Sequence, residues 1–268
     1  MTTTQPASQQ IQPEDIQIVA FDLDDTLAQS KSAVQPDMAR ALADLLAVRP
    51  VCIISGGRFE QFQNQVLSNL PADARLDQLH LMPTCGTRYL RHDGNAWSEV
   101  YAHDLSEQEK AAAIESLERH AKELGLWEGD ERVKGERIED RGSQITFSAL
   151  GQRAEVADKH AWDPGSVKRN ALREAVAPDL PGLEVRAGGS TSIDITQKDI
   201  DKAHGMRELE QQTGIAQANM LFIGDRLQPG GNDYPVLEMG VACHAVEGPD
   251  ETLAYVRDLV EKFQQALG

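Results

Sequence analysis

The sequence predicts an α/β fold in which a doubly wound parallel sheet forms the core and carries an inserted α+β domain. Strands and helices alternate at both ends of the 268-residue chain, and the strands there are short, continuously apolar runs. Such strands are typical of a parallel sheet whose two faces are both covered by helices. The middle of the chain shows alternating, hairpin-like strands and a separate group of helices, which indicates an α+β domain.

The first part of the predicted core follows a polar N-terminal segment. Residues 1–14 contain neither the basic start nor the apolar stretch of a signal peptide, and we predict a disordered tail. Apolar runs then predict strands, and apolar residues at helical spacing predict helices. The predicted order is strand 16–21, helix 35–49, strand 51–55 and helix 58–70.

The last part of the chain continues the alternation. It predicts helix 201–214, strand 219–225, a short helix 234–240, strand 241–246 and a closing helix from about residue 250. The two parts together, residues 15–87 and 197–268, form the predicted Rossmann-like core.

The predicted inserted domain spans residues 88–196. Residues 89–101 alternate around the turn sequence Asp-Gly-Asn and indicate a hairpin. The long helix that follows begins at a pair resembling a capping box, Ser106 and Glu109. Further predicted elements are strand 143–150, helix 165–176 and strands 183–187 and 191–196.

The composition narrows the classes of partner. The formal net charge of −17 argues against nucleic acid and against an anionic membrane surface as partners, because both need a basic surface. No run approaches the roughly 20 apolar residues of a membrane span. The three cysteines lack CxxC spacing, and we interpret Cys52 and Cys243 as buried free thiols of a cytoplasmic protein. The oligomeric state stays open and is compatible with a homodimer.

Acidic residues end the first predicted strand. Asp22 and Asp24 directly follow the apolar run, at the carboxyl end of a parallel strand where ligands bind. Crowded carboxylates repel one another unless they share a cation, and Mg²⁺ prefers such oxygen ligands. A carboxylate can also be a nucleophile that forms an aspartyl phosphate. The alternative is an acidic turn or a helix cap.

Three further segments carry groups suited to the same site. Asp225 ends another apolar strand, and a glycine-rich bend leads from it to Asp233. Ser55 ends the second strand and Gly56 follows it; they offer a hydroxyl and an unhindered backbone N–H to phosphoryl oxygens. Lys202 precedes a helix and could offset anionic charge, although by itself it is more typical of a solvated surface lysine.

In this order, the four segments resemble the motifs of the haloacid dehalogenase superfamily of phosphotransferases. The resemblance implies that Asp22 is the nucleophile and a Mg²⁺ ligand. It implies that Asp24 is the general acid and base, and that it lends a backbone carbonyl to the metal. The remaining implied roles are a metal ligand (Asp225), its direct or water-mediated support (Asp233), and groups that hold the phosphoryl group (Ser55, Lys202).

A closer resemblance to the large-capped subclass of sugar phosphatases and eukaryotic-type phosphomannomutases covers roughly residues 16–246. The segments IEDRGSQITFSALGQR and GGSTSIDIT are similar to substrate-binding parts of that cap domain. The resemblance implies five further substrate-binding positions: Arg141, Lys159, Ser192, Asp194 and Asn232.

The departures from the mutase pattern favour hydrolysis. Gln152 stands where the mutases carry a second arginine, with Arg153 one step away, and Lys159 replaces another arginine. Lysine lacks the planar fork that binds phosphate through two hydrogen bonds. We therefore predict a Mg²⁺-dependent phosphatase acting on a small phosphorylated metabolite, most simply a hexose phosphate. The alternatives are a phosphomannomutase-type phosphohexomutase and a non-catalytic protein that binds phosphorylated metabolites.

Overall fold

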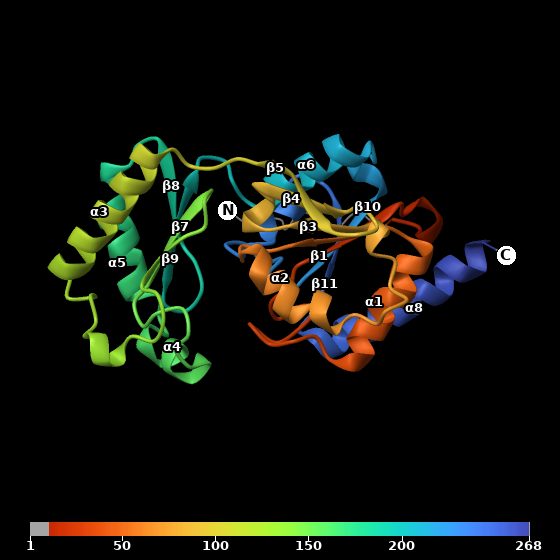
Figure 1. The fold of residues 1–268 in the computed structure, drawn as a ribbon, viewed down its shortest axis with the longest axis horizontal. Coiled ribbons are helices and arrows are strands. Elements are labelled where there is room, and N and C mark those ends of the chain that lie inside the picture. Colours follow the sequence, from red (N-terminus) through yellow and green to blue (C-terminus); the bar gives the residue numbers. More distant parts are fainter. Residues whose placement is uncertain (1–10, 268) are drawn as a thin grey trace, which may run out of the picture. The chain divides into compact units, whose positions relative to one another are not determined.

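The computed structural model describes residues 11–267 and divides into two compact units (Figure 1). The described residues up to Ala102 and those from Asp201 onward form the core unit. His103–Ile200 form the inserted unit. None of the helices within residues 11–267 combines the length and the apolar character that crossing a membrane requires.

A seven-stranded sheet runs through the core unit in the order β11-β10-β1-β2-β3-β4-β5. The pairings from β11 to β3 are parallel, and β4 and β5 are antiparallel. The strands are β1 (Ile18–Phe21), β2 (Val51–Ile54), β3 (Leu79–Met82), β4 (Arg88–His92), β5 (Trp97–Ala102), β10 (Met220–Gly224) and β11 (Ala242–Ala245). This is the predicted doubly wound core.

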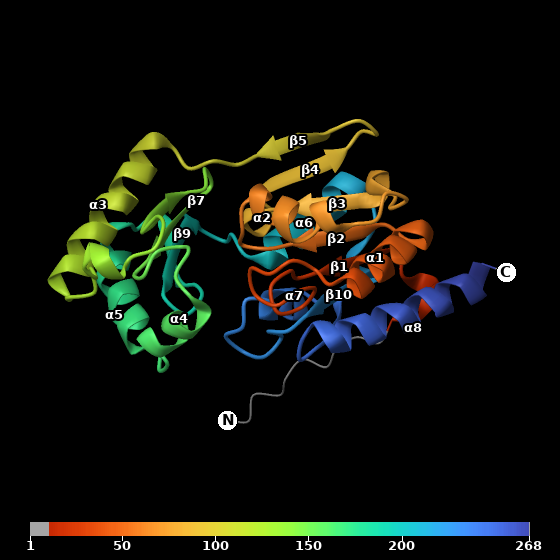
Figure 2. The same cartoon turned by 60° about the horizontal axis from the view of Figure 1, so that its bottom comes forward.

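Helices cover both faces of this sheet (Figures 1 and 2). The strands bury alternate residues on the two faces, so that Val19 and Phe21 join one apolar cluster while Ile18 and Ala20 join another. The first cluster contains α1 (Pro36–Val48), α2 (Phe59–Gln65) and α8 (Pro249–Leu267), and the second contains α6 (Lys202–Thr213) and α7 (Tyr234–Glu238). Continuously apolar strands are explained by this two-sided burial.

The strand order places a topological switch point between β1 and β10. The chain proceeds from β1 to β2 and β3 on one side, and returns later to add β10 and β11 on the other. Ligands of open α/β sheets bind beside the carboxyl ends of the strands at such a point. Phe21 is paired with Ile223, so the residues that follow β1 and β10 emerge side by side.

The hairpin β4–β5 corrects the predicted domain boundary. It forms around Asp93, whose side chain accepts hydrogen bonds from the next turn residues, as the sequence predicts. However, β4 pairs with β3, with Leu90 opposite Leu81, and Leu90 joins the core cluster. The prediction that residues 88–102 belong to the inserted domain is therefore wrong. Strand β3 has no counterpart among the predicted elements.

The N-terminal prediction is also corrected in part. Residues 1–10 lie outside the described residues. Pro13–Asp15 form a short 3₁₀ helix, and Ile11 packs against the core cluster. The carbonyl of Asp15 accepts a hydrogen bond from Asn219 at 2.8 Å. The predicted tail of fourteen residues therefore extends too far into the ordered chain.

The inserted unit is a four-stranded antiparallel sheet with helices packed on one face (Figure 1). Its strand order is β6-β7-β9-β8. Helix α3 begins with the predicted capping box, in which Ser106 and Glu109 bond reciprocally. The elements are α3 (Glu107–Glu123), β6 (Ile138–Asp140), β7 (Gln144–Ser148), α4 (Val156–Trp162), α5 (Val167–Val176), β8 (Leu183–Ala187) and β9 (Ser192–Gln197).

Candidate active site

Three carboxylates gather at the switch point of the core sheet. Asp22 follows β1, Asp225 follows β10, and Asp233 lies at the end of the glycine-rich loop beyond Asp225. Each offers one oxygen, and these three oxygens lie within 4.8 Å of one another. Asp22 and Asp233 are buried, and Asp225 is half-buried. The sequence reasoning that acidic strand ends converge at one edge of the sheet thus describes their placement correctly.

Lys202 bridges two of these carboxylates. Its Nζ lies 2.6 Å from Asp22 Oδ1 and 2.5 Å from Asp233 Oδ1, and its side chain is 1% exposed. The side chain of Asp201 caps helix α6 by accepting a hydrogen bond from His204 N, which fixes the turn that carries Lys202. The alternative that Lys202 is a solvated surface lysine is wrong.

Asp233 is held from both sides. Its Oδ1 accepts from Lys202, and its Oδ2 accepts from the backbone N–H of Arg226 at 3.0 Å. A side chain on Gly224 would come within 2.4 Å of Asp233 Oδ2, so the end of β10 is glycine where this carboxylate packs against it. With both oxygens engaged, Asp233 is suited to orienting Lys202 and the loop after β10.

The charges of Lys202 and the three carboxylates do not balance. Burial raises the pKa of Asp22 to about 7; the charge of Lys202 opposes this rise and that of Asp233 adds to it. Burial, together with Asp233, also raises the pKa of Asp225. Burial opposes the charge of Lys202, but its ion pairs outweigh this and raise its pKa above the ordinary value. Three carboxylates face one ammonium, which leaves an excess of negative charge.

A divalent cation fits this donor set. Hard cations take carboxylate, carbonyl and water oxygens. Asp22 and Asp225 come from adjacent strand ends, and each contributes one oxygen to the group. A cation there would offset the excess charge. Asp22 and Asp225 are the residues that would hold it, with Asp233 in support.

The loop after β2 carries the predicted phosphoryl-binding groups. Ser55 is 4% exposed, and its Oγ accepts a hydrogen bond from Gly57 N at 3.2 Å. The carbonyl of Ser55 accepts from Cys85 N at 2.9 Å, which fixes the loop against the turn after β3. A Cβ on Gly56 would lie 3.9 Å from Cys85 Sγ, which is an ordinary van der Waals contact.

Asp24 stands apart from the carboxylate group. Its Oδ2 accepts from Gln61 Nε2 at 2.7 Å, and its Oδ1 accepts from Gln65 Nε2 at 3.2 Å and from Lys31 N at 2.7 Å. The sequence reasoning missed both glutamines. Their i, i+4 spacing on a helix places them on one face, which is the signal that could have identified them as a pair.

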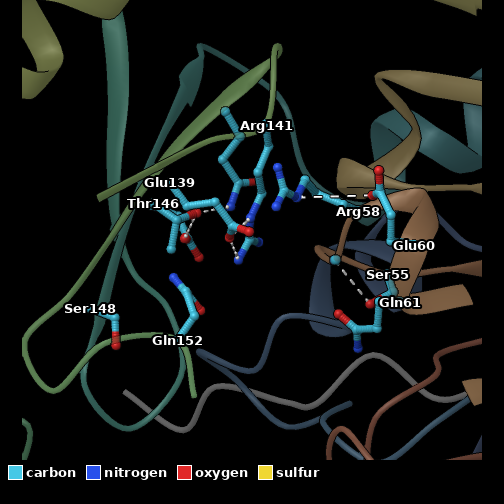
Figure 3. Close-up of polar contacts among 12 residues, drawn as sticks. Ser55, Arg58, Glu60, Gln61, Glu139, Arg141, Thr146, Ser148 and Gln152 are labelled. Atoms are coloured by element: carbon cyan, nitrogen blue, oxygen red, sulfur yellow. Dashed lines mark hydrogen bonds and ion pairs between the residues drawn. The ribbon is translucent and has the colours of Figure 1, made fainter. Parts of the chain in front are cut away.

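In the inserted unit, Arg141 forms an ion pair with a residue of the strand that precedes it. It follows β6, and its Nε and an Nη lie 2.6 Å from Glu139 Oε2 (Figure 3). The side chains of both residues are largely buried. The sequence reasoning also missed Glu139, because two residues of opposite charge on one short strand are common on surfaces.

Asp194 lies on the same side of the inserted sheet. Glu139 is paired with Thr146, and Thr146 with Asp194, across neighbouring strands. Thr146 Oγ1 donates to Asp194 Oδ1 at 2.8 Å and accepts from Gln144 Nε2 at 2.8 Å. Polar side chains thus form a continuous row on this sheet face, which we call the polar row: Glu139, Arg141, Gln144, Thr146 and Asp194.

The other predicted binding residues are more scattered. Ser192 begins β9 and is half-buried, paired with Ser148. Lys159 lies on α4, and its Nζ donates to the backbone carbonyl of Gln152 at 2.9 Å. The remaining two, Arg153 and Asn232, are exposed on loops of the inserted unit and of the core unit, respectively.

Comparisons with known proteins identify the family of this chain. A family model described as haloacid dehalogenase-like hydrolase matches residues 19–258. A phosphomannomutase of Schizosaccharomyces pombe is 24% identical over 249 residues, which cover 90% of this chain and 93% of that relative. A phosphomannomutase of Saccharomyces cerevisiae gives the same identity and the same coverage. The resemblance to the phosphomannomutase-like subclass is thereby confirmed.

Solved structures share this fold. An N-terminally truncated IMP-nucleotidase of Plasmodium falciparum superposes with a TM-score of 0.66 at 16% identity, covering 92% of this chain and 71% of that one. A protein described as trehalose-6-phosphate phosphatase related superposes with a TM-score of 0.57 at 15% identity, covering 93% and 99%. At such identities these structures show the fold alone.

Proposed function

The chain belongs to the haloacid dehalogenase-like hydrolase family, and from that membership we propose that it is a Mg²⁺-dependent phosphatase acting on a hexose phosphate. The observation that carries the proposal is the bridge from Lys202 to Asp22 and Asp233, beside Asp225. The bridge places the buried carboxylate of Asp22 beside the fixed ammonium of Lys202. Asp22 and Asp225 together are suited to holding a cation.

In the proposed reaction, Asp22 and Asp24 carry the two chemical steps. An Asp22 oxygen attacks phosphorus, the bond from phosphorus to the sugar oxygen breaks, and the acid form of Asp24 protonates that oxygen. Water then attacks the phosphorus of phospho-Asp22 and gives a proton to Asp24, and inorganic phosphate and the Asp22 carboxylate are released. Bound Mg²⁺ would supply charge neutralisation for the phosphoryl oxygens. Lys202 keeps Asp22 oriented and offsets its charge.

The proposed substrate class follows from the inserted unit. Its polar row contains two acids, one base and two neutral hydrogen-bonding groups. Sugar hydroxyls both donate and accept hydrogen bonds, so they match such a mixed set. The similarity to phosphomannomutases, which the names of the relatives record, also supports a hexose phosphate.

The second candidate is a phosphohexomutase, which the phosphomannomutase relatives favour. A mutase must hold a sugar bisphosphate while its second phosphate is transferred. Gln152 supplies no charge at the position where the family pattern has arginine, and Lys159 already donates to the Gln152 carbonyl. A hydrogen bond to a charged group contributes about 1.5–3 kcal/mol, so losing one weakens bisphosphate binding about ten- to a hundredfold. We therefore place hydrolysis first.

The test measures phosphate release from a panel of hexose phosphates with Mg²⁺ and with EDTA. We expect EDTA to abolish release, Mg²⁺ to restore it, and Asp22→Asn to form no phospho-enzyme because an amide is a poor nucleophile. Full activity of Asp22→Asn would overturn the proposal. Incubation of mannose 1-phosphate with catalytic bisphosphate decides between the candidates. Formation of 6-phosphate much faster than inorganic phosphate would favour the mutase.

A further inference from the structure

Two glutamines of helix α2 donate hydrogen bonds to the carboxylate of Asp24. They are Gln61 and Gln65, which lie on one face of the helix. Gln65 is 3% exposed, and the same amide nitrogen donates to the Ser32 carbonyl at 2.7 Å. Its Oε1 is also buried and has no hydrogen-bond donor among the described residues. A buried glutamine amide is thus directed at the carboxylate that must transfer the proton.

Gly57 lies next to the Gln61 amide. A Cβ on Gly57 would lie 2.0 Å from Gln61 Oε1 and 2.6 Å from Gln61 Cδ, so a side chain there would displace the amide that contacts Asp24. The backbone of Gly57 is outside the left-handed region, where glycine is favoured. Glycine at this position therefore leaves free the space that the Gln61 amide occupies. Figure 3 shows Gln61 and Ser55 in this part of the core unit.

Glutamine suits a residue that changes its protonation state. Asp24 acts as an acid in the first step and as a base in the second. The carboxylate accepts hydrogen bonds only, whereas the acid also donates one. A glutamine amide has both a donor and an acceptor and can serve both forms, which a lysine or an arginine cannot.

We propose that Gln61 and Gln65 are positioning residues for Asp24, and that Gly57 is glycine to leave room for Gln61. This inference rests on the proposed function, because it assigns a task to the carboxylate that transfers the proton. Gln61 also links two motifs, since it contacts both the loop that carries Ser55 and the side chain of Asp24.

The test separates the two chemical steps with p-nitrophenyl phosphate. p-Nitrophenolate leaves without protonation, so formation of phospho-Asp22 reports on the nucleophile alone. Breakdown of phospho-Asp22 needs a base and is followed by rapid quench after a chase. We expect Gln61→Ala to keep the formation rate within about twofold and to slow breakdown about tenfold. General acid–base catalysis contributes about a hundred- to ten-thousandfold, so loss of positioning removes part of it.

Two further variants make the test specific. Gly57→Ala should slow breakdown as Gln61→Ala does. The double variant Gly57→Ala/Gln61→Ala should be no slower than either single variant, because alanine at 57 then has no amide to displace. Gln63→Ala changes an exposed glutamine of the same helix and should leave both rates unchanged.

The outcomes are distinguishable. If the wild-type protein forms no phospho-Asp22, the proposed function fails and this inference fails with it. If the wild type forms and hydrolyses the intermediate but Gln61→Ala does so at the same rates, the inference alone is overturned. Equal losses in both steps would also overturn it, because they would give Gln61 a general structural role.

Discussion

Removal of the Lys202 ammonium tests the central feature of the core unit. The side chain is 1% exposed, and Nζ lies 2.6 Å from Asp22 and 2.5 Å from Asp233. Breaking a buried ion pair by deleting one partner typically costs about 3–5 kcal/mol, since it leaves an uncompensated buried charge. Lys202→Met preserves the apolar stem and would leave two buried carboxylates without their cation. We therefore expect a loss of about 3–5 kcal/mol in the free energy of unfolding.

The assay is denaturant unfolding at pH 7.5 in EDTA, repeated with Mg²⁺. Mg²⁺ should recover more stability in Lys202→Met than in the wild type, because it would offset the charge that the lysine no longer balances. Lys202→Met/Asp233→Asn should be more stable than Lys202→Met, since one of the stranded charges is removed. Phosphate release by Lys202→Met should be lost even where Mg²⁺ restores stability.

The matched control is an exposed lysine with a similar ion pair. Lys262 Nζ lies 2.6 Å from Asp258, and its side chain is 48% exposed. Lys262→Met should change the free energy of unfolding by about 1 kcal/mol or less, because solvent screens exposed pairs. If Lys202→Met costs no more than Lys262→Met, the buried bridge does not stabilise this site and the reasoning is refuted.

Two further predictions concern Arg141 and Asp22. Arg141→Ala should raise KM for a hexose phosphate about ten- to a hundredfold and leave KM for p-nitrophenyl phosphate unchanged; equal changes for both substrates would give Arg141 a structural role only. Burial raises the pKa of Asp22 to about 7, so between about pH 4 and pH 7 the folded state keeps a proton that the unfolded chain loses. In EDTA, the free energy of unfolding should therefore fall as the pH rises through this range. The same fall with pH in Asp22→Asn would contradict this.

The core site could be predicted because its residues are positioned by local sequence and strand order. An apolar run that ends in aspartate identifies both the strand and the edge from which Asp22 and Asp225 project. Parallel pairing then brings two such ends together, whatever the intervening sequence. The burial of Lys202 could not be predicted from local sequence, because its partners Asp22 and Asp233 lie 180 and 31 positions away in the chain.

The errors arose where a choice depended on long-range pairing. Alternation of apolar and polar residues identifies β4 and β5 as a hairpin but carries no information about which sheet it joins. The pairing of Leu90 with Leu81 decides that. Gln61 was missed for a similar reason, since a polar residue on a short helix is ordinary until a carboxylate from another motif is found opposite it.

The polar row of the inserted unit bears on which phosphorylated sugars the protein would bind. Arg141 is paired with Glu139, and Thr146 directs its only hydroxyl hydrogen to Asp194. A second phosphate group is anionic and mainly accepts hydrogen bonds, so it would meet carboxylates as well as the guanidinium. A sugar hydroxyl can donate to Asp194 and accept from Arg141, and because it is neutral the carboxylates of the row do not repel it. We therefore expect the row to favour the neutral body of a monophosphorylated sugar over a bisphosphate, as the proposed phosphatase activity requires.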